Sequence, residues 1–260
     1  MITRRGGQMN STTMPTALVT GGSRGIGAAT SRELAARGYR VAVNYFSNRE
    51  AADQVVKLIE ADGGEAFAVQ ADVHDPAQAA GLLERSATDG RLDVLVCNAG
   101  ARFVPTPVQA LAWDDFRTKV TDELASVYTL TQQALGVMGA QGQGRIVYVS
   151  SAVADGPPAP GMAAHGTAKA ALNTLARFVA YEAGPLGITV NVVAPGYVRT
   201  ESSANMPQEF QRRLAESTPL GRVAEPEDVA RVIAMLVGEE AGFVTGGVLT
   251  VDGGHGVARR

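Results

Sequence analysis

The stretch TALVTGGSRGIG, residues 16–27, decides the fold. Its first five residues are apolar or β-branched and predict a short buried strand, and an amphipathic helical pattern runs from 25 to 37. The glycines between strand and helix let the backbone approach a pyrophosphate, whose charge the helix N-terminus stabilises. An ordinary turn between a strand and a helix is the alternative. At the end of a first strand, the segment predicts a dinucleotide-binding α/β fold.

Beyond this segment, short β-rich runs alternate with alanine-rich amphipathic stretches. The predicted strands are 16–20, 40–45, 65–71, 92–97, 145–150, 188–194 and 247–251, and the predicted helices are 25–37, 49–62, 76–88, 113–138, 163–184 and 226–237. Nearly continuous apolar strands separated by helices indicate a parallel sheet covered on both faces. We expect one doubly wound α/β domain of about seven parallel strands over residues 15–260, preceded by a disordered arm at 1–14.

Two irregular stretches, 155–161 and 196–225, follow the carboxyl ends of predicted strands. Open α/β sheets bind ligands at those ends. The two stretches therefore predict pocket walls and a lid, with substrate loops at about 153–164 and 197–217.

Composition excludes several classes of protein. The chain has 260 residues, a formal net charge of −3 and 45% hydrophobic residues. Mixed charge signs argue against a nucleic-acid binder, and no apolar run approaches the ~18 residues that span a bilayer. The first residues lack the apolar core of a secretory signal peptide. The single cysteine, Cys97, excludes an internal disulfide, and the three histidines are too scattered in the sequence to predict a metal site. We expect a metal-free cytoplasmic protein.

The end of the second strand predicts the cofactor. An NAD site places an acid there to bind the ribose 2′-hydroxyl, but this chain has Asn44-Tyr45, with Ser47 and Arg49 just beyond. Without the carboxylate, a 2′-phosphate meets no repulsion, and Arg24 and Arg49 could supply its counter-charge. We therefore expect NADP(H) in preference to NAD(H). The alternative is that both arginines are solvated surface charges.

Several motifs extend this pattern along the chain. They are Thr20-Gly21-xxx-Gly25-x-Gly27, Asp72-Val73, Asn98-Ala99-Gly100, Ser150-Ser151, the run PGYVRT at 195–200, GRVAEPEDVA at 221–230 and VTGGVLTVDGG at 244–254. In this order, from about residue 16 to 254, the chain resembles the short-chain dehydrogenase/reductase family. Its general character is similar to the 3-oxoacyl-carrier-protein reductases and to glucose-dehydrogenase-like members. The resemblance implies a Rossmann-type fold and an NAD(P)-dependent oxidoreductase acting on CH–OH and C=O groups.

The resemblance also implies catalytic residues, with two departures. In the family a serine polarises the substrate carbonyl, a tyrosine donates the proton, a lysine lowers the tyrosine pKa, and an asparagine holds a relay water. Ser151 and Lys169 align with the serine and the lysine. However, His165 stands in the place of the tyrosine, and Glu123 stands in the place of the asparagine.

His165 and Lys169 are four residues apart, so a helix places them on one face. An imidazole can exchange a proton near neutral pH, and Lys169 would lower its pKa while Glu123 would raise it. Three hypotheses follow: a carbonyl reductase with His165 as proton donor, a non-redox enzyme using His165 and Glu123 as an acid–base pair, and a cofactor-binding protein without catalysis. A further alternative is that His165 only fills the vacated tyrosine space. Tyr148 and Tyr181 are both expected in the core.

The cofactor site implied by these motifs includes residues that follow several of the predicted strands. Its predicted members are Gly21, Ser23, Arg24, Gly25, Ile26, Gly27, Asn44, Tyr45, Ser47, Arg49, Asp72, Val73, Asn98, Ala99, Gly100, Lys169, Pro195, Gly196, Val198 and Thr200. The expected pocket lining at 101–107, 153–164 and 197–217 is mostly small and apolar, which favours a moderately apolar carbonyl or alcohol substrate. The family resemblance implies a homodimer or homotetramer, with no nucleic-acid or membrane partner.

Overall fold

The structure is a computed structural model that describes residues 14–87, 89–156, 158–201 and 207–257. Almost all of the expected arm at 1–14 therefore lies outside the described residues. The strands are β1 Thr16–Val19, β2 Arg40–Tyr45, β3 Glu65–Gln70, β4 Val94–Cys97, β5 Gly144–Val149, β6 Ile188–Pro195 and β7 Val248–Val251. They form a seven-stranded sheet in the order β3-β2-β1-β4-β5-β6-β7, and every pairing is parallel.

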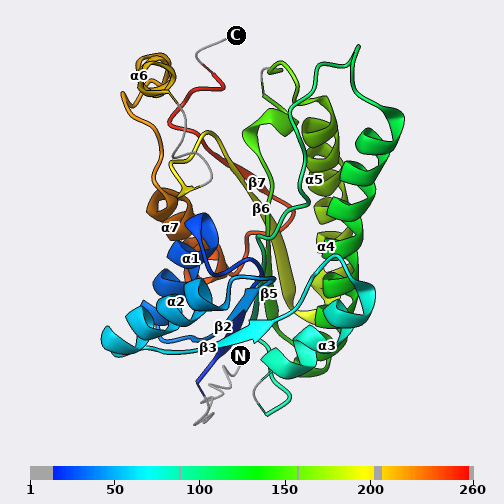
Figure 1. Ribbon diagram of the computed structural model, residues 1–260. Helices are drawn as coiled ribbons and strands as arrows, with labels where there is room; N and C mark the ends of the chain where they lie inside the picture. Colours follow the sequence, from blue (N-terminus) through cyan, green and yellow to red (C-terminus); the bar gives the residue numbers. More distant parts are fainter. Residues whose placement is uncertain (1–13, 88, 157, 202–206, 258–260) are drawn as a thin grey trace, which may run out of the picture.

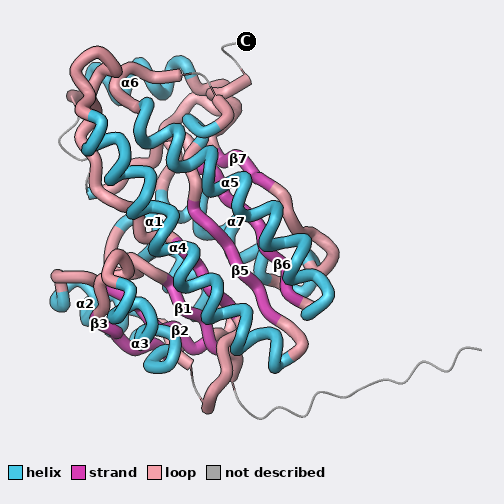
Figure 2. The backbone as a smooth tube through the Cα atoms, turned by 90° about the vertical axis from the view of Figure 1, so that its right-hand side faces the viewer, coloured by secondary structure: helices cyan, strands magenta, loops and turns pink. Residues whose placement is uncertain are grey.

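Helices cover both faces of this sheet (Figure 1), and Figure 2 shows α4 and α5 in front of the strands. On one face lie α1 Gly25–Ala36, α2 Arg49–Ala61 and α7 Pro226–Val237, and on the other lie α3 Pro76–Ser86, α4 Trp113–Gln141 and α5 Ala163–Ala183. Each set packs on its own apolar cluster, so β1, β4 and β6 are buried along their whole length. The sequence prediction of a doubly wound α/β sheet is confirmed.

Local signals fix where several helices begin and end. Asp75 caps α3 by accepting from the Ala77 N–H at 2.9 Å, and Pro76 occupies its first turn. The long helix α4 continues to Gln141, three residues beyond its predicted end at 138, and stops at Gly142 with φ +71°. Glycine reaches this left-handed conformation without the strain that a side chain would bring.

The segment 196–225 is not as poor in helix as we expected. It contains α6, Gln208–Ser217, which the sequence reading missed. None of its residues is buried, and ion pairs such as Arg213–Glu209 at 3.0 Å support it along the surface. Only three of its ten residues, Phe210, Leu214 and Ala215, are apolar, so its sequence lacks the broad apolar stripe that marks a packed helix.

The two tyrosines expected in the core differ. Tyr148 is fully buried on β5, and its hydroxyl lies 2.7 Å from Thr131 Oγ1. Tyr181 was predicted wrongly, because its side chain on α5 is 86% exposed. Among the described residues, no helix is long and apolar enough to cross a membrane.

Candidate active site

A cleft of about 1040 Å³ opens at the carboxyl ends of the strands. It lies where the strand order turns from β1 to β4, the point at which doubly wound sheets bind ligands. Predicted cofactor residues from all the expected segments line it: Gly21, Ser23, Arg24, Gly25, Ile26, Asn44, Tyr45, Ser47, Asp72, Val73, Asn98, Ala99, Gly100, Pro195, Gly196, Val198 and Thr200. Sequence reasoning missed other lining residues, among them His74, Thr118, Asp122 and Glu201.

The turn between β1 and α1 fits an anion. Gly21 and Gly25 have φ of +60° and +50°, and a Cβ on Gly27 would lie 2.1 Å from the Gly21 carbonyl oxygen. The turn is therefore as tight as its glycines allow, and it aims the first turn of α1 at the cleft. Arg24, at the N-cap, makes no side-chain capping bond within the described chain, and the first turn carries no acidic side chain. Free N–H groups and the helix dipole suit a pyrophosphate.

Asn44 has a structural task at the end of β2. Its Oδ1 accepts from the Gly21 N–H at 3.2 Å, and its Nδ2 donates to the carbonyls of Val69 at 3.3 Å and Ala71 at 3.1 Å. An aspartate could not donate to those two carbonyls. Asn44 therefore links the glycine turn to the end of β3, and a carboxylate at this position would lose two of these three bonds.

The two arginines proposed for a 2′-phosphate have different surroundings. Arg24 lies on the cleft wall near Tyr45 and Ser47. Arg49 begins α2, has a side chain that is 78% exposed, and pairs with Asp53 at 3.3 Å. The structure therefore places Arg24 on the cleft wall and leaves Arg49 in an ion pair on the surface of α2.

Asn98 connects β4 to the glycine turn. Its Nδ2 donates to the carbonyls of Thr20 at 2.9 Å and Gly21 at 3.2 Å. Across the cleft, Thr200 approaches the same turn, since a Cβ on Gly25 would lie 3.0 Å from its Cγ2. Asp72 accepts from the His74 N–H at 2.9 Å and holds the turn after β3. Three predicted motifs thus meet around one cradle.

Ser151 and His165 lie on the same cleft wall. Ser151 follows β5 at the start of a short 3-10 turn, Ala152–Ala154, and His165 lies in the first turn of α5. The His165 ring stacks on Phe103, with centroids 4.6 Å apart and an interplanar angle of 14°. Its Nδ1 is buried and has no hydrogen-bond partner among the described residues. A buried polar atom without a partner is costly, so Nδ1 destabilises the site as it stands.

Three charged side chains lie behind this wall, in the interior. The Glu123 carboxylate binds Lys169 Nζ at 2.5 Å through one oxygen and Lys119 Nζ through the other. The side chains of Glu123, Lys119 and Lys169 are only 1%, 2% and 7% exposed. Lys169 also donates to the Val149 carbonyl at 2.7 Å. The Glu123 carboxylate lies directly behind Gly100, which lines the cleft, because a Cβ added to Gly100 would lie 3.5 Å from Glu123 Oε1.

These charges shift the pKa values at the site. Burial alone would raise the pKa of Glu123, but Lys169 and Lys119 outweigh it and lower that pKa to about 2. Burial lowers the pKa of Lys169, against the opposing effect of Glu123. Burial and the two lysines lower the pKa of His165 to about 4, and Glu123 opposes this only in part. His165 is consequently a neutral imidazole at neutral pH.

Lys119 is the charged residue of this buried cluster that the sequence analysis did not predict. It lies one helical turn before Glu123, and two of the three lysines in the chain converge on that carboxylate. The spacing of four residues between Lys119 and Glu123, in a sequence so poor in lysine, was the signal that could have found it.

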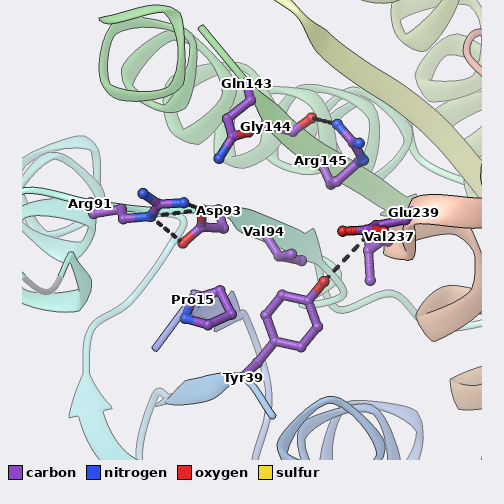
Figure 3. Close-up of a pocket in the computed structure, with 10 residues that line it drawn as sticks. All are labelled: Pro15, Tyr39, Arg91, Asp93, Val94, Gln143, Gly144, Arg145, Val237 and Glu239. Atoms are coloured by element: carbon purple, nitrogen blue, oxygen red, sulfur yellow. Dashed lines mark hydrogen bonds and ion pairs between the residues drawn. The ribbon is translucent and has the colours of Figure 1, made fainter. Parts of the chain in front are cut away.

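Two further cavities lie apart from the cleft. One, of about 680 Å³, is bounded by 107–109 and by residues between 153 and 167, so part of the expected substrate loop lines it rather than the cleft. The other, of about 290 Å³, lies at the opposite, amino-terminal ends of β1, β4 and β5 (Figure 3). There Arg91 binds Asp93 at 2.6 Å, and the Tyr39 hydroxyl donates to the Val237 carbonyl at 3.3 Å. Its principal charges thus neutralise one another.

Comparison with known proteins agrees with this geometry. The profile of a family described as "Enoyl-(Acyl carrier protein) reductase" matches residues 21–256. The cis-4-hydroxycyclohexanecarboxylate dehydrogenase of Sinomonas cyclohexanicum is 40% identical over 92% of this chain and 95% of its own length. The 3-oxoacyl-[acyl-carrier-protein] reductase of Synechocystis sp. is 39% identical over 95% and 98% of the two chains.

Solved structures give the same result. An acetoin dehydrogenase from Enterobacter cloacae superposes with a TM-score of 0.85 at 33% identity, covering 95% of this chain and 98% of its own. A short-chain dehydrogenase/reductase from Serratia marcescens gives 0.86 at 36% identity, covering 93% and 98%. The chain belongs to the short-chain dehydrogenase/reductase family. It is an NAD(P)-dependent oxidoreductase acting on CH–OH and C=O groups.

Proposed function

We propose that this protein interconverts a carbonyl compound and its alcohol with NADP(H), and that His165 exchanges the proton in place of a tyrosine. The observation that carries the proposal is that Ser151 and His165 both line the cleft that the glycine turn after β1 also lines. The small, largely uncharged side chains around them favour a small or medium, moderately apolar substrate.

Preference for NADP(H) is supported by the adenosine end of the cleft. Asn44 leaves no carboxylate to repel a 2′-phosphate, and its own polar atoms already bind backbone. Arg24 lies on the cleft wall with an exposed guanidinium that can bind a phosphate by two parallel hydrogen bonds. We infer that Arg24, rather than Arg49, provides the counter-charge.

A bound nicotinamide supplies or accepts the hydride. The protein handles the proton and the substrate oxygen. Ser151 donates a hydrogen bond to that oxygen. In the oxidation direction, neutral His165 accepts the hydroxyl proton as the hydride leaves carbon, and solvent then takes that proton from the imidazolium. In the reduction direction the same steps run in reverse: the neutral His165 first takes a proton from solvent and then passes it to the developing alkoxide.

Glu123 and Lys169 act from behind the wall in this proposal. Both are buried, and the Lys169 ammonium is bound to Glu123 and to the Val149 carbonyl. Together with Lys119 they form a cluster of two cations and one anion beside His165. The excess positive charge holds the imidazole neutral and stabilises negative charge that develops on the substrate oxygen.

The test is turnover in three proteins. NADPH oxidation over a panel of ketones, and NADP⁺ reduction over the matching alcohols, would be measured for the parent, His165→Ala and His165→Tyr. We expect His165→Ala to lose at least about a hundredfold in kcat, the usual contribution of a positioned acid or base. Equal kcat in the parent and His165→Ala would refute the proton-exchange role of His165.

One observation favours a second function. Lys169 is predicted in the cofactor site, but its ammonium is held in the interior by Glu123 and the Val149 carbonyl, and it is not among the residues that line the cleft. A cofactor-binding protein without reductase activity, or an acid–base enzyme that keeps NADP(H) as a scaffold, would tolerate this arrangement. Activity in His165→Tyr together with an inactive parent would favour this second function.

We also propose that the chain forms a homodimer or homotetramer. Large apolar side chains are exposed on α4 and α5, with Tyr128 56%, Phe178 64% and Tyr181 86% exposed. A second group lies near the edge strand β7, where Phe243 is fully exposed. Apolar side chains clustered on one face mark contact surfaces. Light scattering after size-exclusion chromatography would test this, and a monomer of 27.0 kDa would contradict it.

A further inference from the structure

The irregular segment that enters α4 is held at its start by the buried charge cluster. Lys119 Nζ donates to the Ala101 carbonyl at 2.7 Å, and the Ala101 N–H donates to Glu123 Oε2 at 3.0 Å. Both backbone polar groups of Ala101 are thus bound to side chains of α4. Further along, the Thr106 N–H donates to the Gly161 carbonyl at 3.1 Å. The segment 102–105 is thus tied to the rest of the fold at both ends.

Phe103 lies between Ala101 and Thr106, and its ring contacts both Lys119 and His165. Its ring centroid is 5.2 Å from Lys119 Nζ and 4.6 Å from the His165 ring centroid. An ammonium at this distance from an aromatic ring is attracted to it, and stacked rings attract each other. The Lys119 ammonium and the His165 ring are therefore at most about 10 Å apart, through one shared aromatic side chain.

From these contacts we propose that Lys119 is a positioning residue for His165. Lys119 fixes Ala101, with Glu123 as its partner, and it holds the Phe103 ring flat against the imidazole. Without Lys119 the segment 101–106 loses one anchor, and the His165 ring gains rotational freedom at the cleft wall. The consequence for turnover rests on the proposed function of His165, but the contact itself does not.

Three charged groups act on His165: Lys169 on its own helix, and Lys119 and Glu123 on α4. Arg102 and Asp122 line the same cleft. Removal of the Lys119 charge alone must raise the pKa of His165. One charge within about 10 Å, at an effective dielectric constant of 20 to 40, shifts a pKa by about 0.6 to 1.2 pH units.

The experiment follows the imidazole signals of ¹³C-labelled histidine by NMR, in the full-length protein and across a pH titration. His165 is assigned by the signal lost in His165→Gln. Lys119→Met keeps the length of the side chain and removes the charge, and Phe103→Leu removes the ring while it keeps the charge cluster. Lys57→Met is the matched control, because Lys57 is exposed on α2.

In the parent, we expect the stacked Phe103 ring to shift the His165 signals upfield. We expect Phe103→Leu to abolish this upfield shift and Lys119→Met to reduce it while raising the His165 pKa by about 0.6 to 1.2 pH units. Lys57→Met should leave both quantities unchanged. The proposal is overturned if the His165 signals and pKa of Lys119→Met equal those of the parent. It is also overturned if Phe103→Leu keeps the parental upfield shift. The second variant decides the question if Lys119→Met does not fold.

Turnover separates this inference from the proposed function. If His165 exchanges the proton, Lys119→Met and Phe103→Leu should lower kcat by about ten- to a hundredfold, the effect of small misplacements, with the KM for the cofactor unchanged. If His165→Ala instead keeps the parental kcat, the proposed function fails while the NMR result still decides the positioning role.

Discussion

Replacing Glu123 with glutamine removes the carboxylate that balances two buried ammonium groups. In the parent, this carboxylate is 1% exposed and binds Lys119, Lys169 and the Ala101 N–H. A glutamine keeps the size, but its NH₂ group must point a donor at one of the cations or at the Ala101 N–H. Two cations would then share one amide oxygen in the interior.

The expected loss of stability can be worked out in two ways. Removing one partner of a buried ion pair costs about 3–5 kcal/mol. Separately, the fall of the Glu123 carboxyl pKa from 4.5 to about 2 corresponds to about 3 kcal/mol of stabilisation at neutral pH. Because the two values agree, we expect Glu123→Gln to lower the free energy of unfolding by about 3 kcal/mol at pH 7.

The pH dependence has a defined sign. A carboxyl whose pKa is lowered by folding contributes fully above its unfolded pKa and loses that contribution as the pH falls toward the folded pKa. For Glu123 the window runs from 4.5 down to about 2. The difference in stability between the parent and Glu123→Gln should therefore be constant from pH 8 to 6 and narrow by about 1.4 kcal/mol by pH 3.5.

Urea unfolding followed by far-UV circular dichroism is the suitable assay, because the single tryptophan, Trp113, is 70% exposed and reports poorly on burial. Asp53→Asn is the matched control. It removes an exposed partner of Arg49, and exposed pairs contribute at most about 1 kcal/mol. A Glu123→Gln protein within 1 kcal/mol of the parent, or a difference that does not change with pH, would refute the electrostatic reasoning.

Three further predictions concern the cofactor cradle and the core. In fluorescence titrations, Arg24→Ala should weaken NADP(H) binding by about ten- to a hundredfold and leave NAD(H) binding nearly unchanged, because a charge-assisted hydrogen bond contributes about 1.5–3 kcal/mol. Equal weakening of both cofactors would contradict the role of Arg24. Gly27→Ala should lower the free energy of unfolding by at least about 3 kcal/mol, because its Cβ would lie 2.1 Å from a backbone oxygen of Gly21; an unchanged urea midpoint would show that the turn can relax. Burial raises the pKa of the Cys97 thiol to about 12, so iodoacetamide at pH 8 should modify it at least about a thousandfold more slowly in the native protein than in urea, as mass spectrometry would show.

Much of the fold could be predicted from the sequence because its signals are local. The glycine turn at 21–27 and the alternation of buried strands with helices do not depend on distant residues, and both are confirmed. Helix α6 was missed because it buries no side chain, and Tyr181 was misplaced because aromatic residues on exposed helix faces look like core in a single sequence.

The candidate site could be predicted only in part, because charge pairing inside a fold is a property of three dimensions. His165, Glu123 and Lys169 could be named from their alignment with a family pattern. That the Lys169 ammonium binds Glu123, and that Lys119 supplies a second cation, depends on how α4 and α5 pack. The same holds for Asn44, whose three backbone contacts join β1, β2 and β3.

The pH dependence of alcohol oxidation, measured as kcat/KM for the parent and His165→Tyr, tests most directly whether residue 165 exchanges the proton. Burial and the neighbouring lysines lower the pKa of His165 to about 4, so the parent should lose kcat/KM only below about pH 4 to 5 and stay level from pH 6 to 8. In His165→Tyr the base is a phenol, and the acidic limb should move upward toward the ordinary tyrosine pKa near 10. An acidic limb at the same pH in both proteins would contradict the assignment of proton exchange to residue 165.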